Sequence, residues 1–443
     1  MGRLFGTDGI RGIANVDLKP TLAFALGRAT AHLLAAGDGP IVLGQDTRRS
    51  CDMLAAAVVA GATSMGVDVY RAGVLPTPGL AYLASTGEFA AGIVVSASHN
   101  PAQDNGLKVL DARGLKLDDA LEDELDSLTW RADELTGPTN DGIGREVDAR
   151  GLADRYVEHR SALAARTPSD LHVVLDCANG AGFAVAPRIL AATGARVTTV
   201  FDAPDGVNIN AGCGATAPEA LAARVTELGA DIGIALDGDG DRCVAVDEHG
   251  QVVDGDRLIG AIALDRLGRE ALAQRTLVVS VLSNGGLAAV VEAAGGRVVR
   301  TPVGDKYILD AMLVSGAGLG GEKSGHVIVM EHTTSGDGIV TAIELLGIIA
   351  RRERRLSELA AEIPLFPQQQ RAVRVRHKDQ WNADPMLAGA IADAKAKLEG
   401  TGRIVVRPSG TEAMLRIMVE GEDAERVAAL ADALATLALE RLN

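Results

Sequence analysis

The feature that most constrains this chain is a strand, turn, helix, strand pattern that recurs at domain-sized intervals. At 172–200, HVVLD is followed by CANGAG, an Ala-rich helical stretch and RVTTV, and the segment at 277–299 repeats this order. The matching asparagines, Asn179 and Asn284, lie about a hundred residues apart, which is the length of a domain. A looser copy begins at Ile41 with IVLGQD. Apolar strands that alternate with helices predict βαβ units, each with a buried parallel sheet.

A chain of 443 residues is too long for one hydrophobic core, so we expect several domains. The sequence predicts an α/β protein with three tandem related α/β domains and a C-terminal α+β domain. The last unit is indicated by a change after IPLFPQQQ to the alternating segments RAVRVRH and RIVVRP. The predicted domain ranges are 1–150, 151–250, 251–365 and 366–443.

Charge and composition disfavour several classes of protein. The formal net charge of −16 at pH 7 would repel phosphate backbones and anionic lipids, so neither nucleic acid nor a membrane is an expected partner. The first residues, MGRLFGTDGI, contain no apolar signal segment, and the four cysteines lack the spacing of a metal site. We therefore expect a cytoplasmic protein with reduced, buried cysteines. An anionic ligand would need a local pocket of positive charge.

An acidic, glycine-rich segment at 237–241 reads Asp-Gly-Asp-Gly-Asp between the apolar runs DIGIAL and CVAV. Carboxylates at alternate positions of such a turn can converge as hard oxygen ligands for a cation such as Mg²⁺. This reasoning makes Asp237, Asp239 and Asp241 candidate metal ligands, with an acidic surface turn as the alternative. An EF-hand is disfavoured because Arg242 replaces its required glycine and strands, not helices, are expected on both sides.

The segment IVVSASHNP at 93–101 places Ser98 directly after an apolar strand, with His99 beside it. Loops at the carboxyl ends of strands are where α/β sheets hold ligands. Ser98 is therefore a candidate nucleophile, although the G-x-S-x-G elbow of serine hydrolases is absent. Considered alone, the segment fits an ordinary turn hydroxyl better.

Basic residues in three other segments could bind phosphate. RPSGT begins at Arg407, and Arg416 follows it; guanidinium groups, hydroxyls and turn amides are the donors that suit a phosphate. Such turns are also common on surfaces. FGTDGIR and DNGLK add Arg11 and Lys108 as phosphate or proton partners, although exposed basic residues usually only face solvent.

The segment GEKSGH carries groups suited to a sugar. Glu322 could accept hydrogen bonds from hydroxyls, Ser324 could donate one, and His326 could carry a proton near neutral pH. A lone histidine is more often structural. The preceding G-x-G-x-x-G is not a dinucleotide fingerprint, because a strand-like segment follows it instead of a helix.

Taken in order, FGTDGIRG, SASHNP, DNGLK, DGDGDR, GEKSGH and RPSGTE resemble the α-D-phosphohexomutase family. The similarity runs from Phe5 to the region of Met418 and is greatest to the bacterial branch that acts on glucosamine phosphate. It implies four domains around one central cleft. It also implies transfer of a phosphoryl group between two positions of a sugar, through phosphorylated Ser98 and a bisphosphorylated sugar.

The same resemblance implies a role for each candidate residue. Ser98 would bind one Mg²⁺ together with Asp237, Asp239 and Asp241. The implied catalytic residues, with Lys108 and His326 as acid and base, are Ser98, Lys108, His326, Arg11, His99 and Arg242. The implied substrate-binding residues are Glu322, Lys323, Ser324, Arg407, Ser409, Gly410, Thr411 and Arg416.

Three positions depart from the pattern of the bacterial branch: Lys323 replaces a usual glutamine, Lys306 an arginine and Ala413 a proline. A cation at Lys323 would repel an amino-sugar ammonium unless Glu322 screens it. Exchange of glucosamine 6-phosphate with glucosamine 1-phosphate remains the leading hypothesis. The alternatives are the same reaction on mannose or glucose phosphates, a non-catalytic sugar-phosphate sensor, and a phosphatase.

The resemblance further implies partners for the chain. They are a sugar phosphate as substrate, an activating kinase or a primer such as glucosamine or glucose 1,6-bisphosphate, and a second copy in a homodimer. The product would enter UDP-N-acetylglucosamine biosynthesis and supply peptidoglycan precursors.

Overall fold

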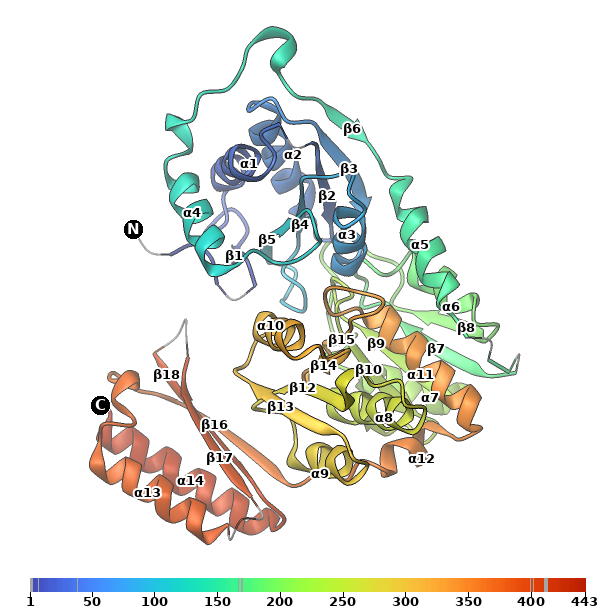
Figure 1. The fold of residues 1–443 in the computed structure, drawn as a ribbon, viewed down its shortest axis with the longest axis vertical. Helices are drawn as coiled ribbons and strands as arrows, with labels where there is room; N and C mark the ends of the chain where they lie inside the picture. Colours follow the sequence, from blue (N-terminus) through green and yellow to red (C-terminus); the bar gives the residue numbers. More distant parts are fainter. Residues whose placement is uncertain are drawn as a thin grey trace.

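The computed structural model describes residues 3–6, 8–37, 39–165, 167–168, 170–398, 400, 402–409 and 413–443. These residues form four sheets, of which the first three mix parallel and antiparallel strands and the last is antiparallel. In Figure 1 the N-terminal sheet lies at the top, the two middle sheets at the lower right, and the C-terminal sheet with its helices at the lower left.

The first sheet has the strand order β1-β5-β4-β2-β3-β6, with β2, β3 and β4 parallel and β5 antiparallel to β4. Every residue of β2 and β4 is buried, as expected for strands with helices on both faces. Its strands are β1 (Ile10–Ile13), β2 (Ile41–Gln45), β3 (Val69–Val74), β4 (Ala91–Val95), β5 (Asp104–Asp111) and β6 (Glu146–Asp148). Its helices are α1 (Pro20–Leu34), α2 (Cys51–Thr63), α3 (Thr77–Ala84) and α4 (Asp119–Trp130), with 3₁₀ turns at Ala132–Glu134 and Asn140–Gly142.

The second sheet has the order β11-β10-β9-β7-β8, in which β7 is parallel to β8 and β9, and β10 is antiparallel to β9. Its strands are β7 (His172–Asp176), β8 (Arg196–Val200), β9 (Ile232–Leu236), β10 (Cys243–Asp247) and β11 (Val252–Val253). The helices of this region are α5 (Leu152–Ala162), α6 (Ala186–Ala191) and α7 (Glu219–Leu228).

The third sheet has the order β13-β12-β14-β15, and only its last pairing, β14 with β15, is antiparallel. Its strands are β12 (Thr276–Ser280), β13 (Arg297–Thr301), β14 (Leu319–Gly321) and β15 (Val327–Val329). The helices are α8 (Gly255–Gly268), α9 (Gly285–Ala293), α10 (Asp305–Ser315), α11 (Gly338–Arg352) and α12 (Leu356–Ala361), with a 3₁₀ turn at Ala273–Arg275.

The C-terminal sheet has the order β16-β18-β17 and is covered by two long helices. Its elements are β16 (Gln368–Arg374), a 3₁₀ turn at Lys378–Gln380, α13 (Pro385–Lys397), β17 (Arg403–Pro408), β18 (Met414–Glu420) and α14 (Ala424–Arg441). This is the α+β unit predicted from the alternating sequence.

The repeat predicted from the sequence is present in each of the first three sheets. In every copy a strand, a helix and a second strand parallel to the first follow one another: β2-α2-β3, β7-α6-β8 and β12-α9-β13. Among the described residues, no helix is both long and apolar enough to span a lipid bilayer.

The hydrophobic cores separate the C-terminal unit from the rest of the chain. One cluster runs through the first three sheets and joins residues such as Leu80, Leu236 and Leu346. The C-terminal unit has a cluster of its own, which includes Leu387, Ile417 and Leu434. The C-terminal unit therefore has a core that does not depend on the others.

Candidate active site

Ser98 lies in the loop that follows β4 and is almost completely buried, with 1% of its surface exposed. Its φ of 53° lies in the left-handed region, where a residue other than glycine is uncommon. Neighbouring groups hold this conformation: the Ser98 N–H donates to Ser96 Oγ at 2.9 Å, and its carbonyl accepts from Asn210 at 2.9 Å. Such strain is found where a structure fixes a residue for function.

Arg48 holds the loop that carries Ser98 through hydrogen bonds to its backbone. Its guanidinium is paired with Asp46 at 2.9 Å and donates to the carbonyls of Ser98 and Asn100, each at 2.8 Å. The sequence analysis did not identify Arg48, Asp46 or Asn210. The polar TRRS segment after a buried strand was the available signal for Arg48, but it does not tell which arginine turns inward.

The aspartate segment forms the loop between the antiparallel strands β9 and β10, in agreement with the predicted flanking strands. Asp237, Asp239 and Asp241 are buried, and one carboxylate oxygen of each lies within 4.8 Å of the others. Ser98 Oγ donates to Asp237 Oδ2 at 2.6 Å. The two segments, far apart in the sequence, therefore meet in one place.

Close packing and backbone conformation explain why glycines occupy two positions of this loop. A side chain at Gly238 would place its Cβ 2.5 Å from the carbonyl oxygen of Ser98, so only glycine lets the two loops approach so closely. Gly240 has a φ of 72°. The alternation of aspartate and glycine therefore serves both the ligand geometry and the contact with Ser98.

The aspartate loop fits a divalent cation. Burial raises the pKa of Asp237 well above its ordinary value, and the nearby charges of Asp241 and Asp239 raise it further. Asp239 Oδ1 and Asp241 Oδ1 are buried and have no hydrogen-bond partner. Clustered carboxylate oxygens without protein donors match the ligands that Mg²⁺ prefers.

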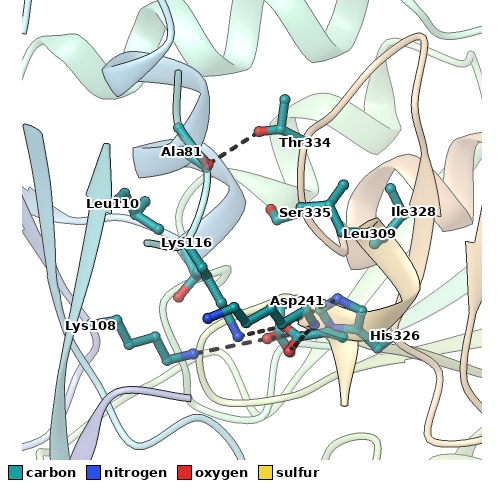
Figure 2. A pocket seen from close by; sticks show the side chains of 14 residues that line it. Ala81, Lys108, Leu110, Lys116, Asp241, Leu309, His326, Ile328, Thr334 and Ser335 are labelled. Atoms are coloured by element: carbon teal, nitrogen blue, oxygen red, sulfur yellow. Dashed lines mark hydrogen bonds and ion pairs between the residues drawn. The ribbon is translucent and has the colours of Figure 1, made fainter. Parts of the chain in front are cut away.

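Lys108 on β5 faces the aspartates from the first domain. Its ammonium lies 2.9 Å from Asp239 Oδ2, 3.0 Å from Asp8 Oδ2 and 4.0 Å from Asp241 Oδ2. Burial lowers the pKa of Lys108, but the three carboxylates outweigh burial and raise it above its ordinary value. Figure 2 shows this ammonium pointing toward Asp241, with His326 beyond it.

His326 lies opposite Lys108, in the loop between β14 and β15. Its Nδ1 is 3.6 Å from Asp241 Oδ2, and its backbone forms an isolated bridge with Arg242. Burial lowers the pKa of His326, whereas Asp241 and Asp305 raise it, and the result is a pKa of about 8. The group thus carries a proton that can be exchanged near neutral pH.

Arg11 and His99 complete the reactive side of the site. Arg11 is ion-paired with Asp8 and lies 3.4 Å from Asn100 Oδ1. His99 Nδ1 is 3.4 Å from Ser98 Oγ. Burial and then the charges of Arg242 and Arg11 lower the pKa of His99 to about 4, so this imidazole is neutral at pH 7.

A cleft of about 430 Å³ opens in front of these groups, and most of the predicted residues line it. The residues that line it are Asp8, Arg11, His99, Asp241, Arg242, Val303, Gly304, Asp305, Glu322, His326, Arg407, Ser409 and Arg416. Four arginines and four carboxylates line this cleft. Arg407 and Arg416 supply positive charge on the side that is farthest from the aspartate loop, where an anion could bind.

The far wall of the cleft comes from the C-terminal sheet. Arg407 and Arg416 are paired across β17 and β18. Burial lowers the pKa of Arg407, and the charge of Arg416 lowers it further, so a bound anion would stabilise both guanidinium groups. The predicted residues Gly410 and Thr411 lie outside the described part of the chain.

The segment GEKSGH, predicted to bind the sugar, lies partly in the cleft and partly outside it. Glu322 lines the cleft and accepts from the Gly304 N–H at 3.1 Å. Ser324 Oγ is buried without a hydrogen-bond partner. Lys323 is not among the described residues that line the cleft, and its ammonium lies 3.3 Å from Gln368 Oε1 and 3.9 Å from Asp254.

Family models match the chain in four consecutive parts. They are described as phosphoglucomutase/phosphomannomutase alpha/beta/alpha domain I over residues 2–136, domain II over 154–250, domain III over 254–366 and the C-terminal domain over 372–437. The chain belongs to the phosphoglucomutase/phosphomannomutase family. It is therefore an enzyme of the mutase type, and both the predicted family and the predicted fold class are confirmed.

Other members of the phosphoglucomutase/phosphomannomutase family match nearly the whole chain. A phosphoglucosamine mutase of Moorella thermoacetica is 50% identical over 431 residues, covering 96% of this chain and 97% of the relative. One from Desulforamulus reducens is 47% identical over 440 residues, covering 99% of each. A solved phosphoglucomutase/phosphomannomutase family protein from Burkholderia thailandensis is 27% identical, with a TM-score of 0.83 over 99% of this chain and 98% of that one.

Proposed function

We propose that this mutase interconverts glucosamine 6-phosphate and glucosamine 1-phosphate through phosphorylated Ser98 and a bisphosphorylated sugar. The observation that carries the proposal is the hydrogen bond of 2.6 Å between Ser98 Oγ and Asp237, beside a cleft lined by arginines. The two curated relatives at 50% and 47% identity, both phosphoglucosamine mutases, support an amino sugar as the substrate.

In this proposal Asp237, Asp239, Asp241 and Ser98 hold one Mg²⁺. When bound, the ion supplies positive charge that stabilises the phosphoryl oxygens during transfer. The donor-free oxygens of Asp239 and Asp241 support this assignment. Arg11, His99 and Arg242 would contact the phosphoryl group from the open side of the cleft.

Each transfer requires a proton movement at both oxygens. When a sugar hydroxyl attacks phosphorylated Ser98, the bond between phosphorus and Ser98 Oγ breaks and a bond to the sugar oxygen forms. The hydroxyl proton passes to the neutral form of His326, and the departing Ser98 oxygen takes a proton from Lys108, whose ammonium is charged. In the return transfer both protons go back, one from His326 to the sugar oxygen that leaves the phosphorus and one from Ser98 to Lys108.

The C-terminal sheet would hold the phosphate that is not reacting, through Arg407, Ser409, Gly410, Thr411 and Arg416. These donors recognise a phosphate rather than one position of the sugar, so they can accept either end of the bisphosphorylated intermediate. Glu322 and Ser324 would bind sugar hydroxyls.

Lys323 is compatible with an amino sugar in this arrangement. Its ammonium is near Asp254 and Gln368, while the carboxylate of Glu322 lines the cleft. The ammonium of a bound amino sugar would therefore lie nearer to the Glu322 carboxylate than to the Lys323 ammonium. We assign Lys323 to the outer part of the substrate site.

Other parts of the proposal concern the surroundings of the reaction. A kinase or a glucosamine or glucose 1,6-bisphosphate would phosphorylate Ser98 initially, in the cytoplasm. The product would supply UDP-N-acetylglucosamine biosynthesis and peptidoglycan precursors. A homodimer and the domain divisions at 150, 250 and 365 also remain predictions.

Replacing Ser98 with alanine tests the proposed nucleophile. We expect Ser98→Ala to lower mutase turnover at least about 10³-fold, because the group that accepts the phosphoryl is lost. Intact mass should show a phosphate adduct on the parent and none on the variant. Ser85→Ala, at a serine outside the site, is the matched control. Full activity of Ser98→Ala would refute the assignment.

Comparing turnover of glucosamine, mannose and glucose phosphates by the parent tests the substrate. The highest kcat/KM is expected for the amino sugar. Activity limited to the neutral sugars would reject this choice and favour the alternative mutase reaction. Release of free phosphate faster than isomerisation would identify a phosphatase, and binding without turnover would identify a sensor.

A further inference from the structure

A closed ring of alternating basic and acidic side chains lies at the wall of the cleft. In order around the ring, its members are Lys108, Asp8, Lys116, Asp305, His326 and Asp241. Each is in contact with the next, and the last is in contact with the first. Figure 2 shows Lys108, Lys116, Asp241 and His326 converging from different segments of the chain.

The distances in the ring are those of ion pairs. Lys116 Nζ lies 2.5 Å from Asp305 Oδ2 and also contacts Asp8 Oδ1. The other carboxylate oxygen of Asp8, Oδ2, is 3.0 Å from Lys108 Nζ. Asp305 Oδ2 is 3.7 Å from His326 Nε2. Asp241 closes the ring, at 3.6 Å from His326 and 4.0 Å from Lys108.

The ring joins three domains. Asp8, Lys108 and Lys116 belong to the first domain, where Lys116 forms a bridge with Leu110 at the end of the β5 hairpin. Asp241 comes from the loop between β9 and β10 in the second domain. Asp305 is the first residue of α10, and His326 follows β14, so both belong to the third.

The proposed reaction gives no role to three members of the ring, Asp8, Asp305 and Lys116, and Lys116 is the one that joins the other two. It lines a small cavity of about 20 Å³ together with Asp241 and His326, and it is not among the described residues that line the open cleft. Burial lowers the pKa of Lys116, but Asp305 and Asp8 raise it above its ordinary value, so the side chain is charged. Without that charge, Asp8 and Asp305 would lose the cation that they share.

We propose that Lys116 is a positioning residue for phosphoryl transfer. Its ammonium holds Asp8 and Asp305 together, and these two carboxylates in turn position Lys108 and His326 at the transfer site. This inference rests on the proposed function, which assigns the proton transfers to Lys108 and His326. Asp8 lies 3.0 Å from Lys108 and Asp305 lies 3.7 Å from His326, whose Nε2 also accepts from the Gly336 N–H at 3.0 Å. One ammonium therefore fixes a carboxylate beside each of the two groups, across a domain boundary. A misplacement of about 1 Å at such a site can lower the rate about 10²-fold.

Replacing Lys116 with methionine tests the inference. We expect Lys116→Met to lower kcat about 10²-fold and to leave KM within about twofold, because the lost group does not line the cleft. Lys116→Arg should recover kcat to within about tenfold of the parent, because a guanidinium can also bridge two carboxylates. A kcat of Lys116→Met within about threefold of the parent would overturn the inference.

Lys306→Met is the matched control. The Lys306 ammonium also joins the third domain to the first, at 2.7 Å from Asp119 and 3.7 Å from Glu122, but these carboxylates are outside the ring. We expect its kcat to stay within about twofold of the parent. An equal loss of kcat in both lysine variants would show that Lys116 is only a link between domains, and would also overturn the inference.

Two further measurements keep the test decisive. If Lys116→Met does not fold, Asp305→Asn weakens the same contact with little change in volume, and its kcat should fall. Only kcat is read for this variant, because Asp305 lines the cleft; an unchanged kcat would count against the inference. A parent without any mutase activity would refute the proposed function. An active parent with an unaffected Lys116→Met would refute only the role of Lys116.

Discussion

At the scale of single residues, the site consists of buried polar groups whose charges are balanced by neighbours. Ser98, Lys108 and His326 are all at most 4% exposed, and each has a partner from another segment of the chain. Low exposure strengthens electrostatic interactions and also makes an unbalanced charge unfavourable. Buried carboxylates outside the site obey the same rule, and Asp256 is the clearest case.

Asp256 should make the stability of the protein depend on pH. Burial and then the charge of Asp254 raise its pKa to about 6, and one of its oxygens has no hydrogen-bond partner. A carboxyl whose pKa is higher in the folded state destabilises the fold as pH rises from about 4 to above 6. Asp256→Asn removes this titration and can still accept from the Asn284 N–H.

We therefore expect Asp256→Asn to gain about 2 kcal/mol in the free energy of unfolding, relative to the parent, between pH 4 and pH 7.5. Urea unfolding at both pH values measures the difference. Asp123→Asn, at an exposed position, is the control and should show almost no such change. A difference between variant and parent that does not change with pH would contradict this account.

At the scale of elements, the sequence predicted the positions of two functional loops because each one follows an apolar strand. Ser98 follows β4 and Asp237 follows β9, as the pattern indicated; Glu322 follows β14, a short strand that the sequence analysis did not predict. Local sequence could not identify Arg48, Lys116 or Asp305, because their role depends on which distant segments they contact. A basic residue in a loop looks the same whether it faces solvent or a buried carboxylate.

Helix α11 depends on one such long-range contact. Asp337 caps its N-terminus by accepting from the N–H groups of Ile339 and Val340, and it pairs with buried Arg160 of α5 at 2.9 Å. Removing one partner of a buried ion pair leaves the other charge without compensation.

Asp337→Ala should therefore lower the free energy of unfolding by about 3–5 kcal/mol. Chemical denaturation followed by circular dichroism measures this loss. Asp154→Ala, which removes an exposed ion pair with Arg188, should cost less than about 1 kcal/mol. Equal effects of the two substitutions would show that the buried pair contributes no more than a surface pair.

At the scale of the whole molecule, polar contacts attach the C-terminal unit to the third domain. Glu420 accepts from the Gly285 N–H at 3.0 Å, and Arg403 joins Glu420 at 2.6 Å and the carbonyl of Val281 at 2.6 Å. The hydrophobic core of the C-terminal unit is a separate cluster that does not include these residues. Polar interfaces of this kind permit one unit to move against another.

Arg403→Met should loosen this attachment. We expect the KM for the sugar phosphate to rise about tenfold, because Arg407 and Arg416 would be held less firmly over the cleft, whereas kcat should change less. Steady-state kinetics measure both constants. Arg371→Met, which breaks an ion pair within the C-terminal unit only, is the control. An unchanged KM in Arg403→Met would show that these contacts do not position β17 and β18 for binding.

The separate core of the C-terminal unit has a consequence for how such an enzyme can change over generations. Under the proposed function, substitutions in β17 and β18 would alter how firmly the non-reacting phosphate is held without disturbing the packing around Ser98. Affinity for the phosphate and the transfer chemistry could thus be inherited as two independently adjustable modules. A chain built in this way can tune its hold on a substrate while keeping an old reaction.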